Sequence, residues 1–159
     1  MGLRWASPPA PALAALMALA GGPGRVGAQQ ATELGVGVIA TASDPALGVG
    51  AVYGALRTSR RMRISAAAGA GMSDERAAWR GELLAHFLLS PDRRQGVGLY
   101  GAGGVAVVGG PVDEGYLVLT LGLEDRPAAA TGWFIEAGVG GGARLAAGYR
   151  WRRFSSSGP

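Results

Sequence analysis

Most of this chain is built from short segments in which apolar residues alternate with small or polar ones. The clearest segment runs from Met62 to Met72, where one register holds Met62 and Ile64 and the other holds Arg63 and Ser65. A period of two places successive side chains on opposite faces of a β-strand. Because no helical period competes with it, we expect an all-β fold.

Eight segments of this kind follow one another, separated by turn residues such as Ser43-Asp44-Pro45. Alternating segments of about ten residues are typical of strands that cross a bilayer as a closed barrel, since lipid cannot satisfy the open edge of a sheet. An even number lets the barrel close as an up-and-down antiparallel structure. Gly103-Gly104 predicts a bulge or a bend inside the fifth segment. The expected strands are 33–42, 47–56, 62–72, 77–89, 96–108, 115–123, 132–139 and 143–154.

The first 28 residues have the features of a signal peptide. Arg4 precedes an apolar run from Ala10 to Ala20, and Val26-Gly27-Ala28 offers a cleavage site between small residues. The run is too short for a membrane-spanning helix, which needs about 20 residues. We therefore expect a signal peptide at 1–28, a barrel domain at 29–154 and a disordered tail at 155–159.

Composition excludes several classes of function. The chain has no cysteine and one histidine, so we expect no metal site. Without Arg4 and Arg25 of the leader, 13 of the 15 basic residues remain against 11 acidic ones, which is no signal for nucleic acid. Two strings, Gly96-x-Gly98-x-x-Gly101 and Gly35-x-Gly37-x-x-Ala40, match the dinucleotide fingerprint, but neither opens a helix. We expect no cofactor.

The face opposite the apolar register carries most of the charges in the strands. The interior of an eight-stranded barrel is just wide enough for side chains to fill it, and an unpaired ion there costs several kcal/mol. We expect a structural network of ion pairs, with a gated or substrate-lined channel as the alternative, and Glu33 with Arg152 as one specific pair. The predicted network consists of Glu33, Arg63, Arg80, Glu82, His86, Glu136, Arg144, Arg150 and Arg152.

Aromatic residues on the apolar register fall mostly in the half of the barrel near the two chain ends. Such a belt marks a membrane interface, and this half would be the periplasmic one. The predicted girdle consists of Tyr53, Phe87, Trp133, Tyr149 and Trp151, with Trp79 alone at the opposite rim. The arginines at 57, 60, 61, 93 and 94 fall in connections on the same side, where they meet solvent or anionic headgroups.

His86 is the one residue that suggests catalysis. A histidine with a serine and an acid could modify lipids at a membrane, but the next position on its face is Leu88 rather than a serine. We therefore expect a member of the polar network and no enzyme, while a lipid-modifying enzyme stays open if a hydroxyl lies near His86.

Residues 33–154 resemble the small eight-stranded outer-membrane barrels of Gram-negative bacteria. The last segment, Leu145-x-Ala147-x-Tyr149-x-Trp151, is similar to the C-terminal signal by which that family is recognised by the barrel-assembly machinery, although Phe154 falls on the inward register and five residues follow it. The resemblance implies a monomer in the lipid bilayer of the outer membrane. With a filled lumen and no wide pore, we expect a structural role in membrane integrity.

One alternative keeps the strands and reverses the faces. A soluble secreted or periplasmic barrel could hold an apolar ligand inside, and it would then need Arg80, Glu82, Arg150 and Arg152 on its outer surface. Alternation alone does not distinguish these two arrangements.

Overall fold

The structure, a computed structural model, describes residues 31–111 and 113–154. The predicted signal peptide at 1–28 and the predicted tail at 155–159 lie outside the described residues. The described chain forms eight strands: β1 (Ala31–Ala42), β2 (Leu47–Arg57), β3 (Met62–Ser73), β4 (Arg76–Leu88), β5 (Val97–Gly109), β6 (Glu114–Asp125), β7 (Thr131–Val139) and β8 (Ala143–Phe154). No helix in this part of the chain is long and apolar enough to span a membrane.

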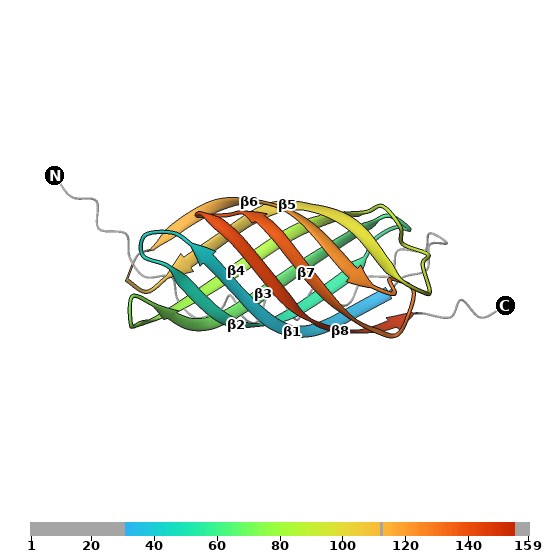
Figure 1. The fold of residues 1–159 in the computed structure, drawn as a ribbon, viewed down its shortest axis with the longest axis horizontal. Coiled ribbons are helices and arrows are strands. Elements are labelled where there is room, and N and C mark those ends of the chain that lie inside the picture. Colours follow the sequence, from blue (N-terminus) through green and yellow to red (C-terminus); the bar gives the residue numbers. More distant parts are fainter. Residues whose placement is uncertain (1–30, 112, 155–159) are drawn as a thin grey trace.

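Each strand pairs antiparallel with the next, and β8 pairs with β1 to close the barrel (Figure 1). The predicted fold, an eight-stranded up-and-down barrel, is confirmed. Closure leaves no free sheet edge, so every strand has a hydrogen-bonded neighbour on both sides. The observed strand ends lie within two residues of the expected ones, and β6 continues to Asp125, which brings Glu124 into the barrel wall.

Of the bulge or bend predicted at Gly103-Gly104, the structure contradicts the bulge. Both glycines pair in unbroken register with β4 and with β6, so β5 carries no extra residue. Gly104 instead permits a close approach of two strands, because a Cβ atom there would overlap the carbonyl oxygen of Leu83 on β4.

The outer surface of the barrel is apolar and the charges of the strands point inward. Large exposed hydrophobic side chains lie on all eight strands, and Leu117 and Leu121 of β6 are 80% and 67% exposed. Within residues 31–111 and 113–154, every exposed charged residue lies in a connection or at a strand end. The alternation therefore sorts apolar side chains outward and charged ones inward, the arrangement of a bilayer-spanning barrel.

The predicted faces of β2 are wrong, and with them the place of Tyr53 in the girdle. Tyr53 lies inside the barrel, 9% exposed, and its ring meets Phe134 edge to face with centroids 5.1 Å apart. Val52 and Leu56 face outward instead. In β2, apolar residues alternate with glycine rather than with polar residues, so the sequence does not tell the two faces apart. The register does, because Tyr53 pairs with inward-facing Gly35 and Ala67.

The two ends of the barrel differ. The terminal end, where β1 begins and β8 ends, carries the connections 58–61, 89–96 and 126–130. At the opposite end, the four connections join Ala42 to Leu47, Ser73 to Arg76, Gly109 to Glu114 and Val139 to Ala143. The longest connection, 89–96, thus lies at the terminal end. Phe87, Trp133, Tyr149 and Trp151 face outward near that end, and Trp79 faces outward near the other.

Candidate functional site

The candidate site is the polar lumen, defined as the interior that the eight strands enclose. The structure places all nine residues of the predicted network in it, each no more than 6% exposed. Two charged residues that sequence reasoning did not assign to the lumen, Arg57 and Glu124, are buried with them. The lumen therefore holds six arginines and four glutamates: Arg57, Arg63, Arg80, Arg144, Arg150 and Arg152 with Glu33, Glu82, Glu124 and Glu136.

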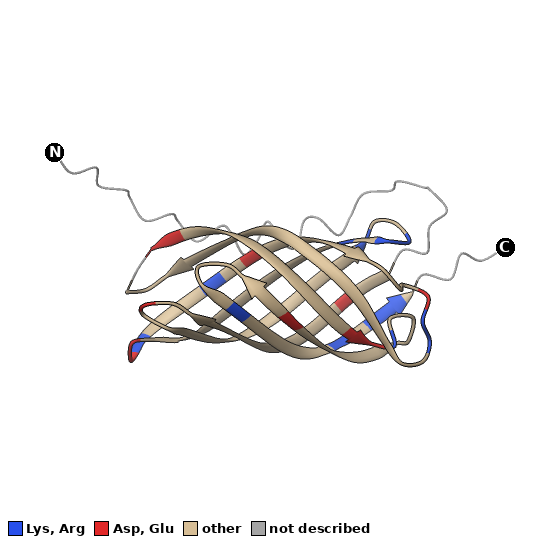
Figure 2. Ribbon diagram, turned by 45° about the horizontal axis from the view of Figure 1, so that its top comes forward, with Lys and Arg blue, Asp and Glu red and all other residues tan. Residues whose placement is uncertain are grey.

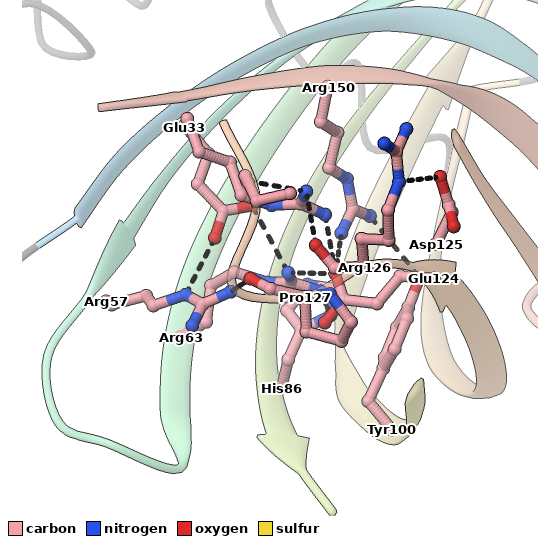
Figure 3. A network of polar contacts seen from close by, with 12 residues as sticks. Glu33, Arg57, Arg63, His86, Tyr100, Glu124, Asp125, Arg126, Pro127 and Arg150 are labelled. Carbon is pink, nitrogen blue, oxygen red and sulfur yellow. Dashed lines mark hydrogen bonds and ion pairs between the residues drawn. The ribbon is translucent and has the colours of Figure 1, made fainter. Parts of the chain in front are cut away.

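Near the terminal end, Glu33 of β1 lies between two arginines (Figure 3). Arg57 Nε donates to Glu33 Oε1 at 2.9 Å, and Arg63 Nη1 donates to Glu33 Oε2 at 3.2 Å. The predicted pair with Arg152 is present as an ion pair: Arg152 faces Glu33 across the β1–β8 register, and its Nε lies 3.7 Å from Glu33 Oε2, although no hydrogen bond joins them. Arg57 and Arg63 are thus the hydrogen-bonded partners of Glu33.

Glu124 of β6 accepts hydrogen bonds from three arginines on one carboxylate oxygen. Its Oε2 accepts from Arg63 Nη1 at 2.9 Å, from Arg152 Nη2 at 3.1 Å and from Arg150 Nη1 at 3.4 Å. The sequence Glu-Asp-Arg-Pro at 124–127 is typical of a loop. Glu124 nevertheless lies an even number of positions after the inward-facing Thr120, so a continued strand would place it on the same face. That parity was the signal that could have placed it in the lumen.

Glu136 of β7 connects the terminal half of the lumen to the opposite half. Its Oε1 accepts from Tyr100 Oη at 2.7 Å and from Arg150 Nη2 at 3.3 Å, and its Oε2 accepts from Arg144 Nη1 at 3.0 Å. Arg144 in turn donates to both oxygens of Glu82, whose Oε1 also accepts from Arg80 Nε at 2.7 Å.

Together these contacts form one continuous chain of alternating charge through the lumen. The order is Arg57, Glu33, Arg63, Glu124, Arg150, Glu136, Arg144, Glu82 and Arg80. Each carboxylate contacts at least two guanidinium groups, which offsets the cost of removing those ions from bulk water. The network thus runs through the lumen from Arg57 at the terminal end to Arg80 in the opposite half.

Aromatic rings fill the space beside the arginines. The guanidinium carbon of Arg150 lies 3.9 Å from the centroid of the Phe134 ring, and that of Arg63 lies 4.9 Å from the centroid of Tyr100. These stacking contacts add to the ion pairs that each of the two guanidinium groups makes with two carboxylates.

His86 has a hydroxyl beside it, contrary to the prediction from Leu88. Ser65 Oγ on β3 lies 2.7 Å from His86 Nε2. The other ring nitrogen, Nδ1, lies 3.2 Å from Nη2 of Arg63, which can only donate. Nδ1 therefore accepts and Nε2–H donates to Ser65, so His86 does not take a proton from the serine. The third member of a catalytic triad, a carboxylate on Nδ1, is replaced here by a cation.

The structure gives no support to a metal centre. Among residues 31–111 and 113–154, no three histidine, cysteine, aspartate or glutamate residues lie close enough together to hold a metal ion.

The lumen ends differently at its two mouths. At the terminal end, the connection 126–130 lies over the network, where Arg57 Nη2 donates to the Pro127 carbonyl at 2.7 Å and Arg152 Nη1 to the Ala129 carbonyl at 3.3 Å. The predicted turn residue Arg57 is therefore buried, and its placement in a solvated turn is wrong. At the opposite end, a hollow of about 110 Å³ reaches inward to Arg80, with Thr41, Ser73 and Tyr116 in its wall.

Comparison with known proteins gives structural neighbours only. No protein-family model matches the chain, and no curated protein matches it. Among solved structures, the N-terminal β-barrel domain of Pseudomonas aeruginosa OprF aligns with a TM-score of 0.63 at 10% identity, covering 80% of this chain and 100% of that domain. Ail, the attachment invasion locus protein of Yersinia pestis, aligns with a TM-score of 0.49 at 11% identity, covering 79% and 99% of the two chains. In its fold, the chain is a small eight-stranded barrel of the type found in the outer membranes of Gram-negative bacteria.

Proposed function

We propose that the chain is an outer-membrane protein that spans the lipid bilayer and serves membrane integrity. The observation that carries this proposal is the sorting of side chains: an apolar outer wall surrounds a lumen in which four carboxylates and six guanidinium groups are paired. An apolar outer wall on all eight strands has no advantage in water but matches acyl chains.

A filled lumen argues against a wide pore. The ion pairs join β1, β2, β3, β4, β6, β7 and β8 across the barrel, and the connection 126–130 is bonded over one mouth. Solute passage would require several of these buried pairs to separate together, each at a cost of several kcal/mol. The protein therefore has a structural role in the membrane rather than that of a channel.

The soluble alternative requires the opposite sorting of side chains. Arg80, Glu82, Arg150 and Arg152 would have to lie on the outer surface, but all four are buried. An apolar ligand would also meet a lumen lined by ions. Both points favour the membrane protein.

A structural role also fits the surroundings of His86 better than catalysis does. The donor Arg63 on Nδ1 removes the base that a serine nucleophile needs, and Ser65 is itself buried in the lumen away from lipid. The proposed partners are the outer-membrane bilayer and, during biogenesis, the barrel-assembly machinery acting on the last strand, where Tyr149 and Trp151 face outward. Because the closed barrel has no free edge, it is proposed to act as a monomer.

Two measurements test this function. The protein should fractionate with outer membranes and change its electrophoretic migration on heating in detergent, and the refolded barrel in a planar bilayer should show no large steady conductance. Recovery in an osmotic-shock fraction would contradict the membrane location, and a large stepwise conductance would contradict the filled lumen.

A further inference from the structure

Charged residues outside the lumen separate by sign between the two ends of the barrel (Figure 2). The terminal end carries six exposed arginines and two aspartates: Arg60, Arg61, Arg93, Arg94, Arg126 and Arg153 with Asp92 and Asp125. The opposite end carries five exposed acidic residues and one arginine: Asp44, Asp74, Glu75, Asp113 and Glu114 with Arg76. Counting the half-buried Asp125, the formal charge outside the lumen is thus +4 at one end and −4 at the other.

The arginines of the terminal end are only partly neutralised by the protein. Arg60 pairs with Asp92 at 2.6 Å, and Arg126 pairs with Asp125 at 2.8 Å. Arg93 donates to the carbonyl of Val97, which carries no charge. In the described part of the chain, the side chains of Arg61, Arg94 and Arg153 form no hydrogen bond or ion pair within the protein. Four guanidinium charges therefore lack a carboxylate partner.

These arginines sit where a membrane surface would be. Arg153 follows the outward-facing Tyr149 and Trp151 on the same face of β8, and those two rings pack against each other with centroids 5.4 Å apart. Phe87 and Trp133 face outward near the same end. Aromatic rings favour the interfacial layer between headgroups and acyl chains, so the arginines beyond them lie at headgroup level.

We propose that the terminal end is a binding surface for anionic phospholipid headgroups, formed by Arg61, Arg94 and Arg153 with the aromatic residues beneath them. The inference rests on the proposed bilayer-spanning function and adds which lipid gathers at which end. Guanidinium groups bind phosphate through two parallel hydrogen bonds and are weakly hydrated. The partner is a phospholipid with a net negative headgroup, such as phosphatidylglycerol, rather than a zwitterionic one.

The acidic opposite end supplies the contrast that this proposal needs. A barrel with uniformly mixed charges would attract anionic lipid equally at both ends. Here the acidic opposite end repels anionic headgroups and the basic terminal end attracts them, so a preference for anionic lipid should be confined to the terminal end.

The test uses tryptophan quenching by brominated lipids. In a W5F/W79F background, Trp133 and Trp151 report on the terminal end. The protein, purified from membranes, is reconstituted in phosphatidylcholine vesicles that contain either brominated phosphatidylglycerol or brominated phosphatidylcholine at the same mole fraction. We expect quenching to give phosphatidylglycerol a relative association constant of about five, the size expected for one basic residue at an anionic surface. In 1 M NaCl the preference should fall towards one.

Two triple variants locate the effect. R61Q/R94Q/R153Q removes three arginines whose side chains form no hydrogen bond or ion pair with the described residues, and it should abolish the preference. D44N/D74N/E75Q at the opposite end should keep it. Equal quenching by both lipids in the unmodified protein, or a preference that survives in the arginine variant, would overturn the inference while leaving the bilayer-spanning barrel in place. If neither brominated lipid quenched the tryptophan fluorescence, the result would instead contradict the proposed function itself.

Discussion

Arg144 of β8 donates two parallel hydrogen bonds to Glu82 of β4 across the lumen. Its Nε donates to Glu82 Oε1 at 2.9 Å and its Nη2 donates to Glu82 Oε2 at 2.8 Å. Both side chains are fully or nearly fully buried. This bidentate pair ties two strands that are not neighbours in the barrel wall, so it braces the barrel through its interior.

Glu82→Gln should strongly destabilise the barrel. The substitution removes the carboxylate that Arg144 and Arg80 share and leaves two buried cations short of a partner. Removing one member of a buried pair costs about 3–5 kcal/mol. The free energy of unfolding, measured by denaturant titration of the refolded protein in detergent, checks this. The exposed Glu75→Gln should change it by no more than about 0.5 kcal/mol; equal effects of the two variants would contradict a bracing role.

The Glu33 carboxylate should couple more strongly to Arg57 than to Arg152. Arg57 donates a 2.9 Å hydrogen bond to Glu33, whereas Arg152 lies 3.7 Å away and gives its hydrogen bonds to Glu124 and to two backbone carbonyls. Double-mutant cycles with E33Q, R57Q and R152Q measure both couplings. We expect about 1–3 kcal/mol for Glu33 with Arg57 and a clearly smaller value for Glu33 with Arg152. E33Q alone should lower the denaturation midpoint.

The sequence predicted the number of strands, their order and most of their faces, because alternation is a local property of each segment. It failed at β2, where Gly48, Gly50 and Gly54 alternate with apolar residues and remove the contrast between the faces. Only the pairing with β1 and β3 decides that Tyr53 lies inside. The pairing in the closed sheet therefore determines which face of β2 points inward, which the sequence of that strand alone does not.

Most members of the lumen network were predictable, and so was the ion pair of Glu33 with Arg152, but the hydrogen-bonded partners were not. Inward parity marks each charged residue independently of the others. Which carboxylate a given arginine reaches depends on strand tilt and on the length of its side chain, so Arg63 and Arg150 both arrive at Glu124 from distant strands. The expected position of Glu33 opposite Arg152 is correct, but the two side chains form an ion pair at 3.7 Å and no hydrogen bond.

The two buried tyrosines of the lumen, Tyr53 and Tyr100, should respond differently to loss of their hydroxyl groups. Tyr100 Oη donates to Glu136 and accepts from Arg150, whereas the buried Oη of Tyr53 has no hydrogen-bond partner among the described residues. Tyr100→Phe should cost about 1–3 kcal/mol because it leaves charged groups without a partner. Tyr53→Phe should be close to neutral. Denaturation midpoints of the two variants check this, and a larger loss for Tyr53→Phe would place an unseen partner on its hydroxyl.

Gly122→Ala should destabilise the barrel by a steric route. Gly122 on β6 lies under the ring of Tyr100, and a Cβ atom there would overlap that ring. The ring would have to move away from Glu136, so we expect a loss of about 1–3 kcal/mol, typical of overpacking. Gly48→Ala is the matched control, since a Cβ atom at Gly48 meets nothing within 4 Å. Similar stability of the two variants would show that the Tyr100 ring has room to shift.

The exposed pair Arg60–Asp92 should make the terminal end sensitive to acid. Arg60 donates to both carboxylate oxygens of Asp92, and this hydrogen bonding lowers the pKa of Asp92 below its usual value. A group whose pKa is lowered by folding stabilises the fold above its unfolded pKa, and that contribution is lost as the pH falls through the lowered value. The pair joins the connections 58–61 and 89–96, so acid should loosen them from each other. An NMR titration of Asp92 should show its midpoint rising in R60Q but not in R76Q at the opposite end. An unchanged midpoint in R60Q would mean that the two connections are held together without this pair.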